Sequence, residues 1–228
     1  MHARRAIVGA TMIFVLAACD PDVAANPSSE LMEVHHKSQE LLVLGRYSEA
    51  ERYAKEALDL GMEEFGPDHT STAALLINLA ATLDGQGRFA EAEPIYKRSL
   101  AITEKALGTA HLDVANKLDN LAGHYALAGD YLEAVPFQLR ALAIVEKALG
   151  PKHPDVANYL TNMGTLYITI GRFSDAEPLY RRSLAIWETT LGPENPKVAM
   201  SLDNLAGLLR LTARADEAEQ MEARAESE

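Results

Sequence analysis

A single spacing constrains this chain more than any other feature of its sequence. Four glycines recur at a step of 42 residues, Gly45, Gly87, Gly129 and Gly171, and Ala213 takes the fifth place. A period between about 20 and 50 residues is typical of proteins built from stacked structural repeats. The chain is therefore expected to fold as a row of similar units, each of which buries its apolar face against its neighbours.

Within each unit, apolar residues are spaced as on one face of a helix. In the third unit Val114, Leu118, Leu121, Ala122 and Tyr125 follow one another at steps of 4, 3, 1 and 3 residues. This spacing predicts an amphipathic helix. The recurring glycine then ends that helix, because glycine adopts a positive φ at little cost.

A second helix is predicted after each of these glycines. Small residues recur where the two helices of a pair must approach closely, at Ala50, Ala92, Ala134 and Ala176. Tyr96 and Tyr180 follow four residues later and are assigned to the core rather than to catalysis. Ser174 is the expected N-cap of the fourth of these helices. The predicted fold class is all-α, an α-solenoid of about five antiparallel helix pairs without any strand.

The first 18 residues carry a different pattern. Arg4 and Arg5 precede an apolar run from Ala6 to Ala18. At about 1.5 Å per residue this run reaches only ~20 Å, which is short of a bilayer core that is ~30 Å thick. The pattern is typical of a secretory signal peptide, predicted over residues 1–18. An uncleaved N-terminal anchor is the alternative.

Cys19 is the only cysteine of the chain and directly follows Leu16-Ala17-Ala18. These four residues resemble the lipobox of bacterial lipoproteins, which implies that Cys19 is acylated and becomes the first mature residue. A buried, unmodified cysteine is the alternative. The predicted organisation is a signal peptide over 1–18, a lipidated tether over 19–29 and a repeat domain over 30–228. Such a protein would be anchored in the bacterial cell envelope and would face the periplasm.

The chain is acidic, and this charge bears on its partners. It has 33 Asp and Glu against 21 Lys and Arg, a formal net charge of −12, and the loss of Arg4 and Arg5 with the signal would bring it to −14. An acidic surface repels the phosphates of nucleic acids and anionic lipid headgroups. The predicted partners are proteins or peptides, with attachment to the membrane through the N-terminal lipid and no nucleic acid.

The offsets within the repeat resemble those of a known family. Leu-Ala-x-x-Tyr, Gly-x-Phe/Tyr-x-x-Ala and Tyr-x-x-Ser/Ala-Leu are similar to the tetratricopeptide repeat. The 42-residue unit, with EAEPLYRRSLAI, GPKHPDVA and LDNLA, resembles the kinesin light chain subtype over residues 30–226. The resemblance implies a right-handed superhelix whose first helices line a concave groove, in which members of the family mostly bind other proteins, often as extended peptides.

Asparagines form the candidate site. Asn78, Asn120, Asn162 and Asn204 recur at the 42-residue step, and Asn116 and Asn158 lie four residues before two of them. An asparagine side chain carries two donors and an acceptor, which suits it to binding a peptide main chain irrespective of sequence. In the kinesin light chain subtype the matching asparagines face the groove and contact the ligand. The alternative is that they tie one repeat to the next through side-chain hydrogen bonds.

Other polar residues are interpreted as structural or solvated. His69, His111 and His153 recur in interhelix turns without metal-ligating residues at fixed offsets beside them, and the adjacent His35 and His36 are interpreted as solvated. We therefore predict neither a metal site nor a cofactor. No serine–histidine–acid arrangement, phosphate-binding glycine loop or H-E-x-x-H motif occurs in the sequence.

These observations predict a non-enzymatic scaffold rather than a catalyst with a small-molecule substrate. The first hypothesis is a membrane-anchored interaction protein that binds an extended peptide or an envelope protein in its concave groove. The alternative is an assembly factor for an envelope complex, such as a pilus or outer-membrane machinery, that acts through its convex faces or ends.

Overall fold

The computed structural model describes residues 27–227, and its secondary structure is entirely helical. The ten helices are α1 (Ser29–Val43), α2 (Tyr47–Phe65), α3 (Thr70–Gly85), α4 (Phe89–Leu107), α5 (Leu112–Ala128), α6 (Tyr131–Leu149), α7 (Pro154–Thr169), α8 (Phe173–Leu191), α9 (Pro196–Leu211) and α10 (Ala215–Ser227). The prediction of an all-α fold with five helix pairs is thereby confirmed. The predicted signal peptide and the acylated Cys19 lie outside the described residues.

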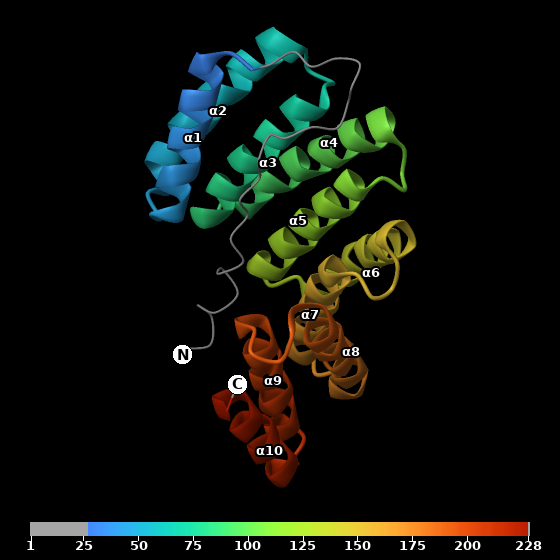
Figure 1. Cartoon of the computed structure of the whole chain (residues 1–228). Helices are drawn as coiled ribbons and strands as arrows, with labels where there is room; N and C mark the ends of the chain where they lie inside the picture. Colours follow the sequence, from blue (N-terminus) through green and yellow to red (C-terminus); the bar gives the residue numbers. More distant parts are fainter. Residues whose placement is uncertain (1–26, 228) are drawn as a thin grey trace.

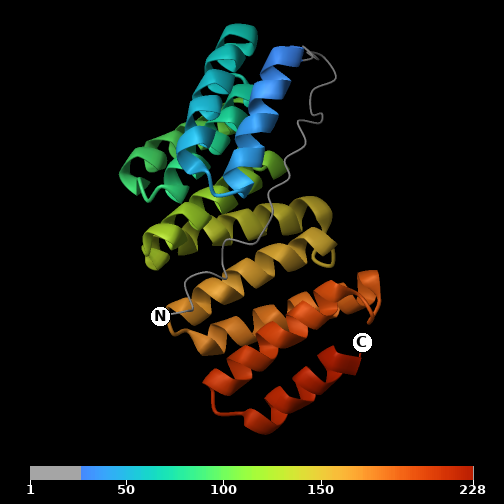
Figure 2. The same cartoon turned by 90° about the vertical axis from the view of Figure 1, so that its left-hand side faces the viewer.

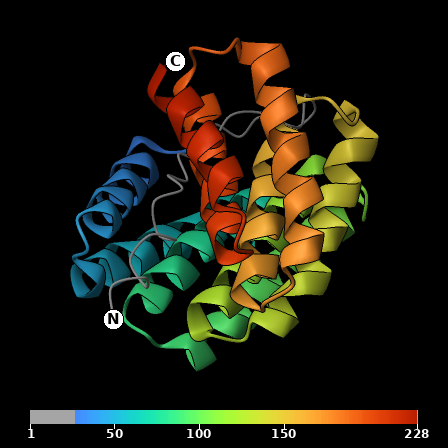
Figure 3. The same ribbon diagram turned by 90° about the horizontal axis from the view of Figure 1, so that it is seen from below.

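Consecutive helices pack as antiparallel pairs, and each pair packs on the next (Figure 1). α1 also packs against α3, and α3 against α5. The odd-numbered helices therefore form one layer, named here the first-helix layer, and the even-numbered helices form the second-helix layer. The pairs follow one another along the stack from blue to red (Figure 2), and the row winds round when it is seen from below (Figure 3).

The core runs without interruption from the first pair to the last. The recurring alanines of the second-helix layer are fully buried, each 0% exposed: Ala50, Ala92, Ala134 and Ala176. Tyr96 and Tyr180 are 4% exposed, so their assignment to the core is confirmed. A side chain as small as that of alanine lets two helices approach closely, while the larger tyrosine rings fill the space between units.

Histidines begin three of the odd-numbered helices. The Nδ1 atoms of His69, His111 and His153 accept the backbone N–H of the residue two positions later, at 3.1–3.2 Å. Asn195 caps α9 in the same way through its side-chain oxygen. A helix leaves its first N–H groups without partners, and these side chains supply an acceptor. The three histidines are therefore structural residues at helix N-termini.

The even-numbered helices begin earlier than expected. α8 begins at Phe173, directly after the turn in which Gly171 has a φ of 78°. Ser174 therefore lies inside α8, and the prediction of Ser174 as N-cap is wrong. Arg172 takes that place without a side-chain cap. Pro178 lies within α8, as Pro94 and Pro136 do within α4 and α6, and all three prolines are exposed. Proline has no N–H to donate, so the carbonyl four residues earlier loses its helical hydrogen bond. That carbonyl is on the solvent side of the helix in each case.

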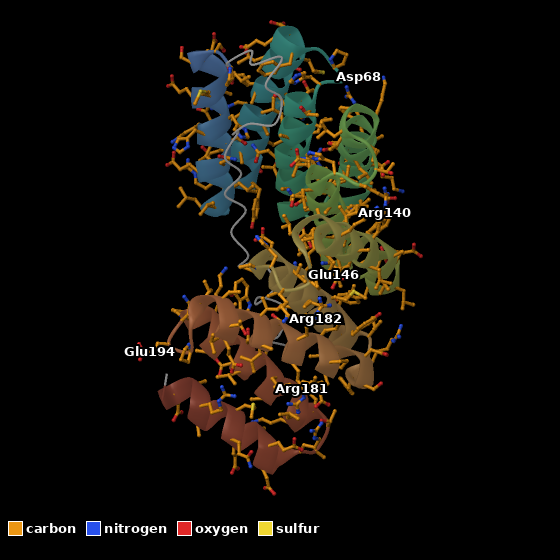
Figure 4. The ribbon with its side chains drawn as sticks, turned by 45° about the vertical axis from the view of Figure 1, so that its right-hand side comes forward. Asp68, Arg140, Glu146, Arg181, Arg182 and Glu194 are labelled. Atoms are coloured by element: carbon orange, nitrogen blue, oxygen red, sulfur yellow. The ribbon has the colours of Figure 1, made fainter. Side chains whose placement is uncertain are left out.

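Ion pairs connect successive helices of the second-helix layer. Arg140 pairs with Glu104 at 2.6 Å, Arg182 pairs with Glu146, and Arg224 pairs with Glu188 at 2.6 Å. Each arginine lies 36 residues after its glutamate, so the repeat period brings the partners together. Arg140, Glu146 and Arg182 are labelled in Figure 4, which shows Arg182 next to Glu146.

Within residues 27–227, no helix combines the length and the apolar character needed to span a membrane.

Candidate functional site

The six asparagines predicted as a binding site all lie on the first-helix layer. Asn78 is on α3, Asn116 and Asn120 on α5, Asn158 and Asn162 on α7, and Asn204 on α9. The 42-residue step places Asn78, Asn120, Asn162 and Asn204 at equivalent positions of neighbouring helices. Their side chains nevertheless have different surroundings.

Asn78 connects the first two units. Its Nδ2 donates to Ser38 Oγ at 2.9 Å and lies 3.5 Å from His35 Nδ1. Asn78 and His35 are each only 8% exposed. The interpretation of His35 as solvated is therefore wrong, because the second unit covers its ring, whereas His36 is exposed. Burial lowers the pKa of His35, and the neighbouring His36 lowers it further.

Two other asparagines connect α5 to α7. Tyr159 donates its hydroxyl to Asn116 Oδ1 at 2.9 Å, and Asn162 donates its Nδ2 to Asp119 Oδ1 at 3.1 Å. Asn78, Asn116 and Asn162 thus make the hydrogen bonds between repeats that the alternative interpretation anticipated. Asn162 is nevertheless exposed and Asn116 is half-buried, so both remain within reach of a ligand.

The other three asparagines make no side-chain hydrogen bond within the described part of the chain. Asn158 is exposed and Asn204 is half-buried. Asn120 is only 8% exposed, and its Nδ2 is a buried donor without an acceptor in residues 27–227. Such a donor costs about 1–3 kcal/mol relative to one that is hydrogen-bonded. Binding by the six asparagines stays a prediction, and Asn120 is the member whose unpaired donor is buried.

Charged residues beside Asn120 are held in a partly dehydrated environment. Burial raises the pKa of the Asp119 carboxyl, against the opposing effect of the hydrogen bond from Asn162. Burial likewise lowers the pKa of Lys117, which is 6% exposed. The third unit therefore carries a buried lysine where the neighbouring units have Leu75 and Tyr159.

A second polar cluster connects α3, α4 and α5. His124 Nδ1 lies 2.7 Å from Asp84 Oδ1, and both side chains are almost completely buried. The ring of Tyr96 lies 5.2 Å from that of His124, and burial together with Asp84 raises the Tyr96 pKa. No repeating pattern predicts this cluster, because the equivalents of His124 are Thr82, Leu166 and Leu208. Its burial makes it part of the interface between repeats.

Trp187 also belongs to the core. It is 2% exposed, and the Lys197 ammonium lies 4.2 Å from the centre of its ring. Within residues 27–227, no three His, Cys, Asp or Glu side chains come together as ligands for a metal ion.

A family model described as Tetratricopeptide repeat matches residues 41–105, 113–189 and 171–227. This chain belongs to the tetratricopeptide repeat family. The family's fold is a scaffold for protein–protein interaction, and the expected family is thus confirmed.

Three solved structures show the same fold. A protein from Podosopora anserina described as a kinesin light chain with nearly identical TPR-like repeats is 23% identical, with a TM-score of 0.75 over 87% of this chain and 94% of that one. BtubC (BKLC) from P. vanneervenii is 22% identical, with a TM-score of 0.74 over 86% and 78%. Aspartyl phosphate phosphatase F from Bacillus subtilis is 14% identical, with a TM-score of 0.73 over 87% and 50%.

At these identities the likeness concerns the fold alone. No curated protein sequence matches the chain.

Proposed function

We propose that this protein is a membrane-anchored interaction scaffold that binds an extended peptide segment across its first-helix layer. The observation that carries the proposal is the row of asparagines at equivalent positions of α3, α5, α7 and α9, of which Asn162 is exposed and Asn204 is half-buried. Neighbouring packed helices lie about 8–10 Å apart, so four of them span ~30 Å. An extended peptide at about 3.3 Å per residue would cross them with about nine residues.

The affinity expected from such contacts is modest. Each net hydrogen bond contributes about 0.5–1.5 kcal/mol, and a peptide loses conformational freedom when it binds. Four main-chain hydrogen bonds therefore correspond to dissociation constants in the micromolar range, unless side-chain contacts add to them.

A double variant tests the binding site. Asn120→Ala with Asn162→Ala is expected to weaken peptide binding at least tenfold. The melting temperature is expected to fall only by the loss of the exposed hydrogen bond from Asn162 to Asp119, because Asn120 donates none within the described fold. Asn78→Ala is the comparison variant: it loses the hydrogen bond to Ser38 and is expected to lower the melting temperature. Thr189→Ala, on the exposed side of α8, is the neutral control. Binding to an array of nine-residue peptides and thermal unfolding are measured for each variant.

The membrane anchor rests on the sequence of the N-terminus. The run Leu16-Ala17-Ala18-Cys19 follows an apolar segment of the kind that precedes acylated cysteines. Metabolic labelling with a radioactive fatty acid is expected to label the wild-type chain and not the Cys19→Ser variant. Equal labelling of both chains would exclude Cys19 as the attachment point.

One observation favours the second candidate, an assembly factor that uses its outer surface. Leu132, Pro136 and Leu139 form an exposed row on α6, with Leu132 73% and Leu139 46% exposed. The equivalents of Val135 and Leu139 in α2, α4 and α8 are Glu–Lys or Glu–Arg ion pairs. Cross-linking from this face, with a photoreactive residue in place of Leu139, would capture a partner if this candidate is right. Recovery of short peptides only, from the first-helix layer, would exclude it.

A further inference from the structure

The solvent side of α6 carries a stripe of apolar residues along three helical turns. Leu132, Pro136, Leu139 and Ala143 are all exposed, and they follow one another at steps of 4, 3 and 4 residues. Residues at these steps lie in one line along a helix, and apolar residues at the same steps form the seam between two helices of a coiled coil. These four residues, named here the α6 stripe, therefore have the spacing of a surface on which another helix packs.

The fold itself does not require apolar residues in the α6 stripe. Leu132 is 73% and Leu139 is 46% exposed, so neither leucine is part of the core. The equivalents of these two leucines are Ser48 and Lys55 in α2, Ala90 and Lys97 in α4, and Ser174 and Arg181 in α8. In those three helices the lysine or arginine forms an ion pair with a glutamate of the same helix, and Val135 replaces that glutamate in α6. α6 thus presents apolar side chains where its counterparts present charges.

Two charges of opposite sign lie beside the two ends of the α6 stripe. Glu133 directly follows Leu132, and Lys147 follows Ala143 by one helical turn. Both side chains are exposed, and neither has an ion pair or a hydrogen bond within residues 27–227. They are separated by about four helical turns, so they lie along the same edge of the helix. An acidic and a basic group are thus available at opposite ends of one apolar surface.

This distribution of charge makes the α6 stripe complementary to itself. When a second copy of α6 lies against it in the antiparallel direction, the Glu133 end of each copy meets the Lys147 end of the other, and both contacts are attractive. A parallel copy would instead place Glu133 beside Glu133 and Lys147 beside Lys147. The leucines lie on an apolar surface in either direction, so the charges decide the orientation.

The surroundings of the α6 stripe do not oppose contact between two copies. The nearest charges on α4 and α8 are already neutralised within their own helices, by the pair of Glu93 with Lys97 and the pair of Glu177 with Arg181. The net charge of −12 is distributed over the whole chain. At physiological ionic strength, charges more than ~8 Å apart are largely screened. α6 is also the middle helix of the second-helix layer (Figure 1).

We propose that two copies of this chain associate through the α6 stripe as an antiparallel, twofold-symmetric pair. Leu132 of one copy packs near Ala143 of the other, and Glu133 pairs with Lys147 of the other. A contact of a surface with its own copy closes after two chains. The α6 stripe is smaller than the about 800 Å² per partner that a standard interface buries, so we expect a dissociation constant on the order of 100 µM. This inference goes beyond the proposed peptide binding, which uses the opposite layer.

Sedimentation equilibrium of the full-length chain with Cys19→Ser, which excludes lipid and intermolecular disulfides, tests the association up to about 500 µM. Leu132→Ser with Leu139→Lys introduces the residues that α2 carries at these positions and is expected to weaken association at least tenfold. The melting temperature is expected to stay the same, because both leucines are exposed. Leu127→Ser with Leu211→Lys changes two exposed leucines of the first-helix layer and is the matched control, expected to associate as the wild type does.

A charge swap tests whether the occupant is a second copy. Glu133→Lys alone and Lys147→Glu alone are each expected to weaken association about threefold to tenfold, because each places like charges at both contacts. The two changes together in one chain restore opposite charges and are expected to restore association. Both changes oppose the helix dipole, so the melting temperature of each variant is measured alongside. A double variant that associates no better than the single variants, while it remains folded, would overturn the pairing.

Cysteine cross-linking tests the orientation. Chains with Leu132→Cys and chains with Ala143→Cys, both also carrying Cys19→Ser, are mixed and oxidised. The antiparallel arrangement is expected to give the mixed disulfide in at least fivefold excess over either homodimer, because it brings the start of one α6 to the end of the other. An excess of the Leu132→Cys homodimer would show a parallel contact and overturn the arrangement proposed.

The outcomes also separate this inference from the functions proposed above. A chain that stays monomeric up to about 500 µM would overturn the association and leave the α6 surface to an envelope complex, as in the second candidate function. Association that persists unchanged in Leu132→Ser with Leu139→Lys would place the contact elsewhere and overturn the inference as well. Peptide binding is expected to be unchanged in every α6 variant, so its loss in Asn120→Ala with Asn162→Ala is tested independently.

Discussion

At the scale of single residues, a polar side chain that is buried inside the stack can reduce the stability of the fold. Asp119 lies on the first-helix layer between its own helix pair and α7, and it accepts a hydrogen bond from Asn162. This bond does not fully replace the water that the carboxylate loses, since burial raises the pKa of Asp119. The ionised form of this residue is therefore less stable in the folded protein than in the unfolded chain.

The raised pKa of Asp119 predicts that the stability of the fold depends on pH. A carboxyl whose pKa is higher in the folded state costs stability once it is ionised, so stability falls as the pH rises from the unfolded value of about 3.9 through the folded value. Asp119→Asn keeps an oxygen for the Asn162 hydrogen bond and removes the charge. We expect this variant to unfold at higher urea concentration than the wild type at pH 7, and the difference to shrink as the pH falls toward 4.

Urea titrations at pH 4, 5.5 and 7 measure this difference. Asp203→Asn is the matched control, because Asp203 is the equivalent residue of α9 and is exposed. A difference between Asp119→Asn and wild type that stays constant over this range would show that the carboxyl is not destabilised by burial.

At the scale of helices, neighbouring helices are connected by different interactions in each of the two layers. The first-helix layer uses buried hydrogen bonds such as that of Asn78 with Ser38, whereas the second-helix layer uses Arg–Glu ion pairs at its surface. A buried hydrogen bond is costly to break because its partners are left unpaired, whereas an exposed ion pair exchanges readily with water. The first-helix layer is thus expected to set the geometry between repeats.

The ion pair of Arg182 and Glu146 tests how strongly the helices of the second-helix layer are connected. Their side chains are 39% and 30% exposed, and exposed pairs contribute about 0.2–1 kcal/mol. Arg182→Gln is expected to reduce the free energy of unfolding by no more than about 1 kcal/mol, including the loss of its hydrogen bond to the Pro151 carbonyl. A double-mutant cycle with Glu146→Gln, in low salt and in about 1 M salt, measures the coupling. A coupling above about 2 kcal/mol that persists in high salt would contradict the expectation that this ion pair contributes little to stability.

At the scale of the whole molecule, each helix pair is stabilised mainly by its immediate neighbours, as in other stacked-repeat proteins. The last pair is expected to be the least stable, since α10 is a polar helix that buries Ala218 against α9. On the α9 side, Leu208 and Leu209 are 1% and 0% exposed. The final helix therefore closes the end of the core.

Removal of residues 215–228 tests this role. The shortened chain is expected to melt at a lower temperature and to self-associate, because the apolar side of α9 loses its cover. Size-exclusion chromatography with light scattering measures the association, and a chain that ends at residue 225 is the control. A shortened chain that remains monomeric and melts with the wild type would show that α10 is dispensable.

How far the sequence predicts this protein depends on which residues repeat. Ala176 and Tyr180 were assigned to the core because equivalent residues occur in other units. His35 occurs in one unit only, and it is buried because the second unit packs against it, with Asn78 beside its ring. The start of α8 was misplaced because Ser174 has the chemistry of an N-cap, whereas the turn at Gly171 allows the helix to begin before it.

The sequence by itself determined the repeat length, the helix pairs and the positions of the asparagines, because these follow from spacings along one chain. Only the tertiary structure decided which asparagines are already hydrogen-bonded between repeats, and which leucines of α6 are exposed. Those properties depend on how one unit is set against the next. Atoms separated by a full repeat in the sequence, such as those of Asn162 and Asp119, meet only when the units stack.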